Sequence, residues 1–257
     1  MLGAIAGDII GSVHEFLGEK TRNFPLFVAD STFTDDTVLT VAVADVLLSG
    51  ASYVDKFHDY TNRYPGRGYG IGFHHWVRSR SRNPYNSWGN GSAMRVSPVA
   101  YAFNTLSEVL KEAEVSASVT HNHPEGIRGA QATAAAIFLA LQRESKTDIR
   151  SEIERRFGYD LSRTVDAIRP TYAFNESCQD TVPQAIISFL DASDYEDTIR
   201  NAISLGGDAD TLACIAGGIA GAYYGVPQDI RSRTWGRLDT SLHSTTRLFC
   251  EKYSIEV

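Results

Sequence analysis

The chain has 257 residues, enough for one large domain or two small ones with a proper hydrophobic core. Apolar residues make up 43% and charged residues 21%, the usual proportions of a globular protein. The net charge of -7 argues against general binding to nucleic acid or to membrane surfaces, and no apolar run approaches the ~20 residues of a membrane span. Three cysteines without CxxC spacing favour a reducing compartment. Because Asp8 interrupts the first apolar run, we expect no signal peptide and a cytoplasmic protein.

Helical patterns follow one another along most of the chain. Apolar spacing and helix-stop signals predict helices over residues 4–13, 36–48, 108–118, 128–142, 148–156, 181–190, 195–205, 211–224 and 242–253. The best strand candidate is the short segment 24–28. No linker or shift in composition divides the chain. The sequence therefore predicts an all-α protein, a compact single-domain helical bundle over residues 1–257.

The first predicted helix carries a glycine at every fourth position. Gly3, Gly7 and Gly11 fall on nearly one face, where another backbone can approach closely. The helix predicted over residues 211–224 is also rich in glycine and alanine. We expect both helices to be buried.

Two acidic clusters lie far apart in the chain, and each is at the predicted start of a helix. Residues 34–37 read TDDT and residues 208–211 read DADT. A helix start needs only one acceptor side chain at its N-cap, and each cluster offers several. Capping can still explain either cluster taken alone. If buried helices bring the clusters together, four carboxylates repel one another unless cations lie between them. Oxygen ligands of this kind suit Mg²⁺ or Mn²⁺, so the pattern indicates a metal-dependent enzyme.

The charge inverts between residues 56 and 95. This segment holds seven Lys and Arg residues against one acid, and it is rich in aromatic residues. Glycine loops interrupt it at residues 66–72 (GRGYGIG) and 89–91 (GNG). Backbone N–H groups in such loops can hold phosphate oxygens, and aromatic rings can stack on a base. A ligand with a pyrophosphate and an adenine suits both features, although a solvated surface with simple turns explains the same letters.

Six segments carry a resemblance to a known family. They are GAIAGDIIGSVHE at 3–15, FTDDT at 33–37, RGYGIG at 67–72, SWGNGSAMR at 87–95, THNHPEG at 120–126 and LGGDADT at 205–211. In this order they resemble the ADP-ribosylglycohydrolase family, which includes the dinitrogenase-reductase-activating glycohydrolases and the ADP-ribosylhydrolases. The resemblance covers about residues 3–225 and implies a compact all-α fold with two divalent cations, Mg²⁺ or Mn²⁺, in a cleft.

The resemblance also implies a role for each motif. The metal ligands would be Thr34, Asp35, Asp36, Asp208, Asp210 and Thr211. The ADP-ribose diphosphate and adenosine would contact Ser87, Trp88, Gly89 and Asn90, with Gly68, Gly70 and Gly72 in a second phosphate-side loop. His121 matches a histidine near the distal ribose. Trp88 stands where serine-specific relatives have tyrosine, and Asn86 stands where they have glycine. The sequence therefore does not decide whether this loop has the shape that it has in those relatives.

Cleavage of a ribosyl bond passes through an oxocarbenium-like state, by analogy with glycoside hydrolysis. The implied metals would fix the ribose hydroxyls and activate a water. A carboxylate near the anomeric carbon would then act as general base. Glu15 is our choice for this role, and Asp36 or a water held by the metals are its rivals. We predict a monomeric, metal-dependent hydrolase that releases ADP-ribose from an ADP-ribosylated protein or a small ADP-ribosyl conjugate.

Two other functions stay open at this point. One is a metal-dependent phosphohydrolase of a nucleotide-like substrate, because pairs of metal ions also serve phosphate esters. The other is a non-catalytic ADP-ribose-binding module, against which the presence of Glu15 and all six metal-type ligands argues. The choice among arginine, serine and O-acetyl linkages is also open.

Overall fold

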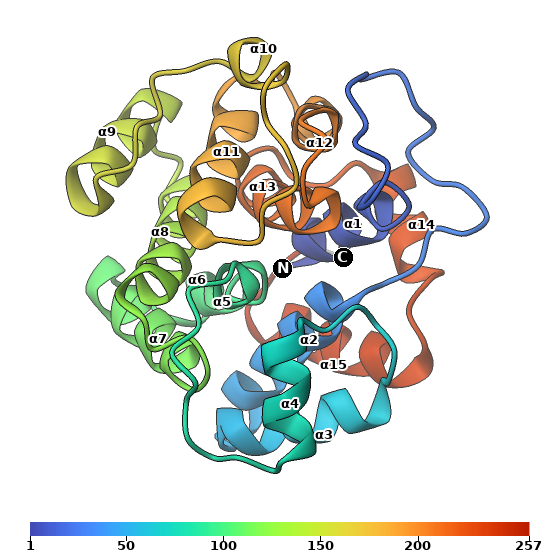
Figure 1. The fold of residues 1–257 in the computed structure, drawn as a ribbon, viewed down its shortest axis with the longest axis vertical. Coiled ribbons are helices and arrows are strands. Elements are labelled where there is room, and N and C mark those ends of the chain that lie inside the picture. The colour runs from blue at the N-terminus through green and yellow to red at the C-terminus, as the bar shows by residue number, and fades with distance from the viewer. Residues whose placement is uncertain (257) are drawn as a thin grey trace.

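This computed structural model describes residues 1–256 of the chain. These residues contain fifteen helices joined by turns and loops (Figure 1). In chain order they are α1 (Leu2–Gly11), α2 (Asp35–Ser49), α3 (Tyr53–Arg63), α4 (Ile71–Arg78), α5 (Gly91–Met94), α6 (Val99–Ala102), α7 (Leu106–Ser118), α8 (Pro124–Leu141), α9 (Lys146–Phe157), α10 (Val165–Ile168), α11 (Cys178–Leu190), α12 (Tyr195–Ser204), α13 (Ala209–Tyr224), α14 (Gln228–Trp235) and α15 (Thr240–Lys252). Extended pairing within the described residues is limited to an isolated antiparallel bridge between Gly89 and Ser177. The all-α, single-domain prediction is confirmed.

All nine predicted helices are present, with ends that differ by a few residues. The strand predicted at residues 24–28 is wrong, because this segment is irregular. Its backbone carbonyls are satisfied from outside a sheet: Arg200 donates to the carbonyl oxygen of Phe24 at 2.8 Å. The rings of Phe24 and Phe27 are buried. The apolar residues of this segment therefore reach the core from a loop.

Side-chain caps begin α7 and α8 two and four residues before the predicted starts at 108 and 128. Thr105 and Glu108 form a capping box at the start of α7. The His123 ring accepts a hydrogen bond from the Glu125 N–H at the start of α8, where Pro124 occupies the first turn. These bonds are local in sequence, so they leave a signal in the letters.

Helix α1 packs along α13 at the centre of the bundle (Figure 1). Every residue of α1 is buried. A Cβ atom on Gly7 would lie 2.0 Å from the carbonyl oxygen of Ala213, and one on Gly11 would lie 2.5 Å from the Cα atom of Asp210. The predicted close approach at the glycine face is confirmed. It brings the end of α1 against the start of α13.

The other helices surround this central pair. Helices α8, α11 and α12 pack on α13, while α3 and α15 pack on α2, which itself contacts α1 (Figure 1). The starts of α2 and α13 therefore meet beside the end of α1. Within residues 1–256, none of the helices combines the length and the apolar character needed to cross a membrane.

Candidate metal centre and active site

A cleft of about 470 Å³ opens where the starts of α2 and α13 meet the turn that follows α1. This volume lies in the range of small-molecule sites. One part of its wall is acidic, and the other part consists of glycine loops and aromatic rings. The lining includes Glu15, Asp35, Asp36, Gly68, Gly70, Gly72, Tyr85, Ser87, Gly89, Asn90, Arg95, His121, Glu176, Asp208, Asp210 and Thr211.

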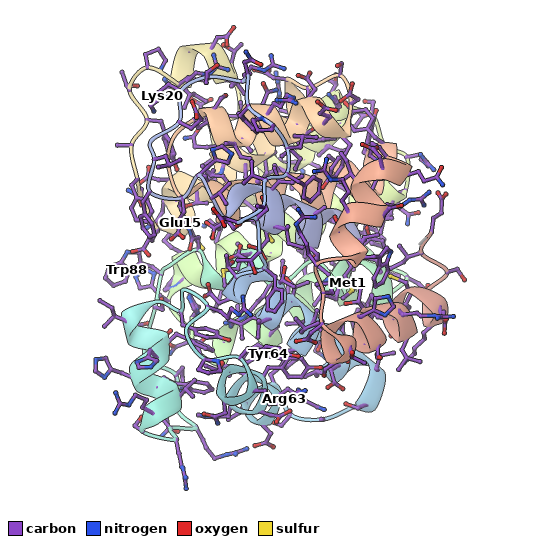
Figure 2. The ribbon with its side chains drawn as sticks, turned by 90° about the vertical axis from the view of Figure 1, so that its right-hand side faces the viewer. Met1, Glu15, Lys20, Arg63, Tyr64 and Trp88 are labelled. Atoms are coloured by element: carbon purple, nitrogen blue, oxygen red, sulfur yellow. The ribbon has the colours of Figure 1, made fainter. Side chains whose placement is uncertain are left out.

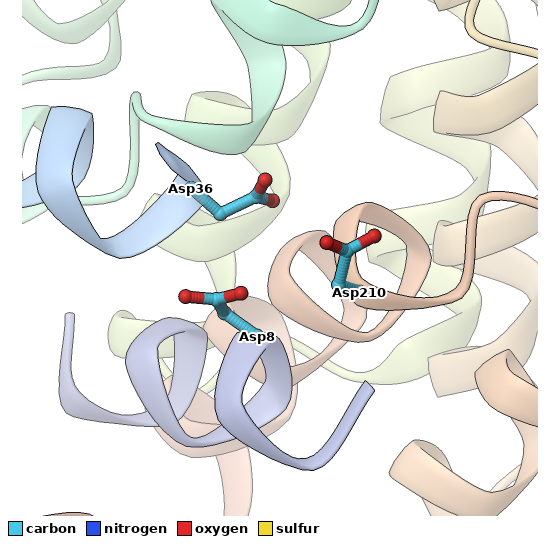
Figure 3. Close-up of side chains that lie close together, drawn as sticks. All are labelled: Asp8, Asp36 and Asp210. Atoms are coloured by element: carbon cyan, nitrogen blue, oxygen red, sulfur yellow. The ribbon is translucent and has the colours of Figure 1, made fainter. Parts of the chain in front are cut away.

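Two groups of carboxylates form one continuous acidic centre. Oxygen atoms of Asp8, Asp36 and Asp210 lie within 4.8 Å of one another and face a common point (Figure 3). Oxygen atoms of Glu15, Asp208 and Asp210 meet the same limit. Asp210 belongs to both groups, so the groups are contiguous. The centre thus combines side chains from α1, its following turn, α2 and the start of α13.

Asp8 joins α1 to the start of α2. Its carboxylate accepts hydrogen bonds from the Thr34 N–H at 3.0 Å, the Thr34 hydroxyl at 2.6 Å and the Thr37 N–H at 3.1 Å, and also from the Thr37 hydroxyl. The Thr34 hydroxyl in turn accepts from the Asp36 N–H at 3.3 Å. Asp8 therefore fixes the first turn of α2, which carries Asp36.

Sequence reasoning missed Asp8 as a member of the site. It was used only to argue against a signal peptide. A signal was nevertheless present, because a carboxylate in a helix of otherwise small and apolar residues has no Lys or Arg within that helix to pair with. Such a group needs hydrogen-bond donors or a cation from elsewhere in the fold.

The acidic centre has no cationic side chain as counter-charge. None of the ion pairs among residues 1–256 involves Glu15 or any aspartate of the centre. The Oδ1 atom of Asp36 is buried without a hydrogen-bond partner. Burial, followed by repulsion from neighbouring aspartates, holds the pKa values of Asp36 and Asp210 well above their usual range. A divalent cation that displaces the protons from these buried carboxyl groups would find the oxygen ligands that hard cations prefer.

Glu15 lies in the turn after α1 and is half-buried. Burial raises its pKa, and the charges of Asp208, Glu176 and Asp8 raise it further, to about 7. Glu176 also lines the cleft, and sequence reasoning missed it. A carboxyl group with a pKa near neutrality is suited to proton transfer.

The remaining predicted metal ligands occupy different positions. Asp35 lines the cleft, and its N–H donates to the carbonyl oxygen of Arg67 at 2.8 Å. The Thr211 hydroxyl donates to the Asp36 carboxylate at 3.4 Å. Thr34 is the N-cap of α2 and lies behind the cleft wall, bonded to Asp8. Five of the six predicted ligands therefore line the cleft.

The predicted substrate loops also meet at the cleft. Gly68, Gly70 and Gly72 line it together with Ser87 and Gly89. Gly68 adopts φ 98°, and a Cβ atom there would lie 3.1 Å from the Asp35 Oδ1 atom. The loop therefore runs directly against Asp35 at the start of α2.

Asn90 links the second loop to the acidic centre. Its side-chain amide donates to Asp208 Oδ2 at 2.7 Å and to the Thr181 hydroxyl at 3.1 Å. Trp88 differs, because its side chain is 55% exposed and is not part of the cleft lining. The Trp88 ring lies 5.8 Å from that of His123, on the same side of the molecule as Glu15 (Figure 2). Trp88 is thus a rim residue and Asn90 a buried one.

His121 is buried and lines the cleft. Burial first, and the nearby Arg95 second, hold its pKa well below the usual range, so the ring is neutral. Arg95 is fully buried, directly after α5, and sequence reasoning gave it no role of its own. Among the described cleft-lining residues it is the only Lys or Arg.

Comparisons with known proteins identify one family. The family model described as ADP-ribosylglycohydrolase matches residues 1–253. The chain is 29% identical over 308 residues to "ADP-ribosylhydrolase ARH3" of Mus musculus, covering 89% of this chain and 83% of that protein. It is 26% identical over 279 residues to "ADP-ribosylarginine hydrolase Tri1" of Pseudomonas putida (strain GB-1), covering 92% and 74%.

A solved structure supports the fold. The structure described as "ADP-ribosylglycohydrolase-related protein complex" has a TM-score of 0.70 and 24% identity, and covers 100% of this chain and 97% of that one. Because the family match extends over nearly every residue, this chain is a member of the ADP-ribosylglycohydrolase family.

Proposed function

We propose that this protein is a metal-dependent hydrolase that cleaves the glycosidic bond between ADP-ribose and an acceptor and releases ADP-ribose. One observation carries the proposal: an acidic centre without cationic counter-charge shares a cleft with two glycine loops. The relatives named as ADP-ribosylhydrolases support the bond type. The acceptor is a side chain of an ADP-ribosylated protein or a small conjugate. We further propose that the protein is a monomer and, from its cysteines, that it lies in the cytoplasm.

We assign two divalent cations, Mg²⁺ or Mn²⁺, to the acidic centre. Asp210 belongs to both carboxylate groups, which supports two ions that share this ligand. The other ligands would be Asp35, Asp36, Asp208 and the hydroxyl of Thr211. Of the remaining members of the two groups, Asp8 is bonded to Thr34 and Thr37 and holds the start of α2, and Glu15 is assigned to proton transfer. When bound, the ions supply Lewis acidity and positive charge beside the ribose hydroxyls.

Glu15 is assigned as the general base. Its carboxylate takes a proton from the attacking water as the bond between the anomeric carbon and the acceptor breaks, and this proton then passes from Glu15 through solvent to the leaving acceptor. Burial first, and then the charges of Asp208, Glu176 and Asp8, raise the pKa of Glu15 to about 7, which makes it a competent base near neutral pH. Asp36 remains the rival for this role, because its Oδ1 atom has no partner.

The glycine loops are assigned to the ADP-ribose moiety. Backbone N–H groups of residues 68–72 would hold the diphosphate. In the second loop the N–H groups of Ser87, Gly89 and Asn90 donate within the protein, so there the N–H of Trp88 is the one assigned to the ligand. The exposed ring of Trp88 at the rim offers a face for the adenine. His121, which lies beside Gly89 and Gly91 on the cleft wall, would contact the distal ribose.

A linkage panel tests the proposal. Purified protein with Mg²⁺ or Mn²⁺ is given ADP-ribosyl-arginine, ADP-ribosyl-serine and O-acetyl-ADP-ribose, and the products are separated by chromatography. We expect intact ADP-ribose from at least one substrate, and no turnover by the Asp208→Asn control. Glu15→Gln should keep metal binding and lose turnover by about 10²–10⁴-fold.

Three other results would contradict the proposed reaction or the proposed base. Release of AMP or phosphate in place of ADP-ribose would identify a phosphohydrolase. Binding of ADP-ribose without cleavage of any linkage would identify a binding module. A fully active Glu15→Gln variant would remove Glu15 from the role of base.

A further inference from the structure

A chain of hydrogen bonds leads from the buried Arg95 to the histidine on the cleft wall. The Nη2 atom of Arg95 donates to the Ser116 carbonyl oxygen at 3.2 Å and to the Thr120 hydroxyl at 2.8 Å. The same hydroxyl oxygen lies 2.7 Å from Nδ1 of His121. Arg95 and Thr120 are fully buried, and His121 is 4% exposed. Solvent therefore does not compete for these bonds.

The chemistry of the three groups decides where the protons lie. A guanidinium group can only donate, so the Thr120 oxygen accepts from Arg95. The hydroxyl then has one proton left to place. If it donates that proton to Nδ1, Nδ1 carries no hydrogen and the proton of the neutral imidazole is on Nε2.

The opposite tautomer leaves a buried donor without a partner. With the proton on Nδ1, the Thr120 oxygen would accept from both Arg95 and His121, and its own O–H would need another acceptor. Within residues 1–256 the Thr120 hydroxyl has no further hydrogen-bond partner. Because a buried unsatisfied hydroxyl is unfavourable, the Nε2–H tautomer is preferred.

Two further features direct the Nε2 edge toward the cleft. A Cβ atom on Gly91 would lie 3.2 Å from Nε2, so this edge of the ring passes close to the GNG turn. No hydrogen bond to Nε2 exists among the described residues.

Arg95 stays protonated at neutral pH, since burial lowers its pKa only to about 10, and a second positive charge on His121 is disfavoured beside it.

We propose that Arg95 and Thr120 are positioning residues that hold His121 as a neutral imidazole with its proton on Nε2. His121 then offers the cleft a hydrogen-bond donor for a hydroxyl or phosphate oxygen of the ligand. It does not act as a base at this atom. The tautomer follows from the protein alone, whereas the identity of the ligand oxygen rests on the proposed function.

The tautomer is read directly by nuclear magnetic resonance of protein labelled with ¹⁵N-histidine, where protonated and unprotonated ring nitrogens have distinct chemical shifts. The His121 signals are assigned by their loss in His121→Gln. We expect the proton on Nε2 in the wild-type protein and in Thr120→Ser, which keeps the hydroxyl. Thr120→Val removes the hydroxyl with little change of shape, and we expect Nδ1–H to become populated.

Calorimetric titration with ADP-ribose in the presence of Mg²⁺ measures how the tautomer affects ligand affinity. Thr120→Val should bind about tenfold more weakly than the wild-type protein, and Thr120→Ser about as well. A proton on Nδ1 in the wild-type protein would overturn the proposal, and so would an unchanged tautomer in Thr120→Val. A changed tautomer with unchanged affinity would show that His121 does not donate to the ligand. The expected tautomers without any binding of ADP-ribose would contradict the proposed function and leave the positioning role standing.

Discussion

The substitution Gly11→Ala tests whether the contact between α1 and α13 sets the geometry of the acidic centre. Gly11 ends α1 and lies directly against the first turn of α13, which contains Asp210. The added methyl group would lie 2.5 Å from the Cα atom of Asp210 and 2.7 Å from the carbonyl oxygen of Ala209. Both contacts are with backbone, so no side-chain rotation relieves them.

The expected displacement follows from these distances. An ordinary Cβ contact begins near 3.4 Å, so the start of α13 must move by about 0.9 Å (3.4 minus 2.5). Overpacking of this kind costs about 1–3 kcal/mol of unfolding free energy. Metal sites tolerate deviations of about 0.2 Å in ligand distance, so we also expect Mn²⁺ affinity to fall by at least about tenfold.

Chemical denaturation and calorimetric Mn²⁺ titration measure the two effects. Gly236→Ala is the matched control, because its added methyl group would meet nothing closer than 3.5 Å at φ -67°. We expect the control to be neutral or slightly more stable. If Gly11→Ala keeps wild-type stability and Mn²⁺ affinity, the close approach of α1 does not hold Asp210 in place.

Three other predictions follow from the site. The raised pKa values of Asp36 and Asp210 favour their protonated forms in the folded state, so their contribution to stability is present below about pH 4 and lost as pH rises through the raised values. In thermal scans with and without chelator, Mg²⁺ should therefore raise the melting temperature more at pH 8 than at pH 5, and an equal effect would argue against metal binding by these groups. Trp88→Ala should weaken ADP-ribose binding by about 5- to 100-fold and leave Mn²⁺ affinity unchanged, whereas Trp88→Phe should retain most of the binding; equal loss in both would exclude stacking. Asp8→Asn should lower the unfolding free energy by about 1–3 kcal/mol in urea titrations, because the amide cannot accept from all the donors at the start of α2, and unchanged stability would contradict this role.

The parts of the molecule that the sequence predicted are those with local signals. The glycine face of α1 has a period of four, and the acidic clusters lie at helix starts, so both could be read from neighbouring letters. The structure brings the two clusters into one cleft, as expected. The assignment of each residue to metal or substrate remains a prediction.

The parts that were missed depend on distant contacts. Helix α3 has few aliphatic residues, and its buried face consists of Tyr53, Phe57, Tyr60 and Thr61, which periodicity of aliphatic residues does not reveal. Residues 24–28 have strand-like letters, but they pack as a loop beneath arginines from α12 and α14. Asp8 and Arg95 gain their roles only from partners more than twenty residues away.

The distribution of charge around the cleft links these missed residues to the proposed chemistry. The carboxylates of the acidic centre are held by hydrogen bonds from neutral groups, such as those from Thr34 to Asp8 and from Asn90 to Asp208. These donors orient the oxygens and leave their negative charge uncompensated, which favours the binding of cations. The buried cation of the cleft, Arg95, is instead bonded to Thr120 on the side of His121. The cleft therefore combines a group of carboxylates with a buried cation beside His121, an arrangement that suits the proposed hydrolysis of an ADP-ribosyl bond.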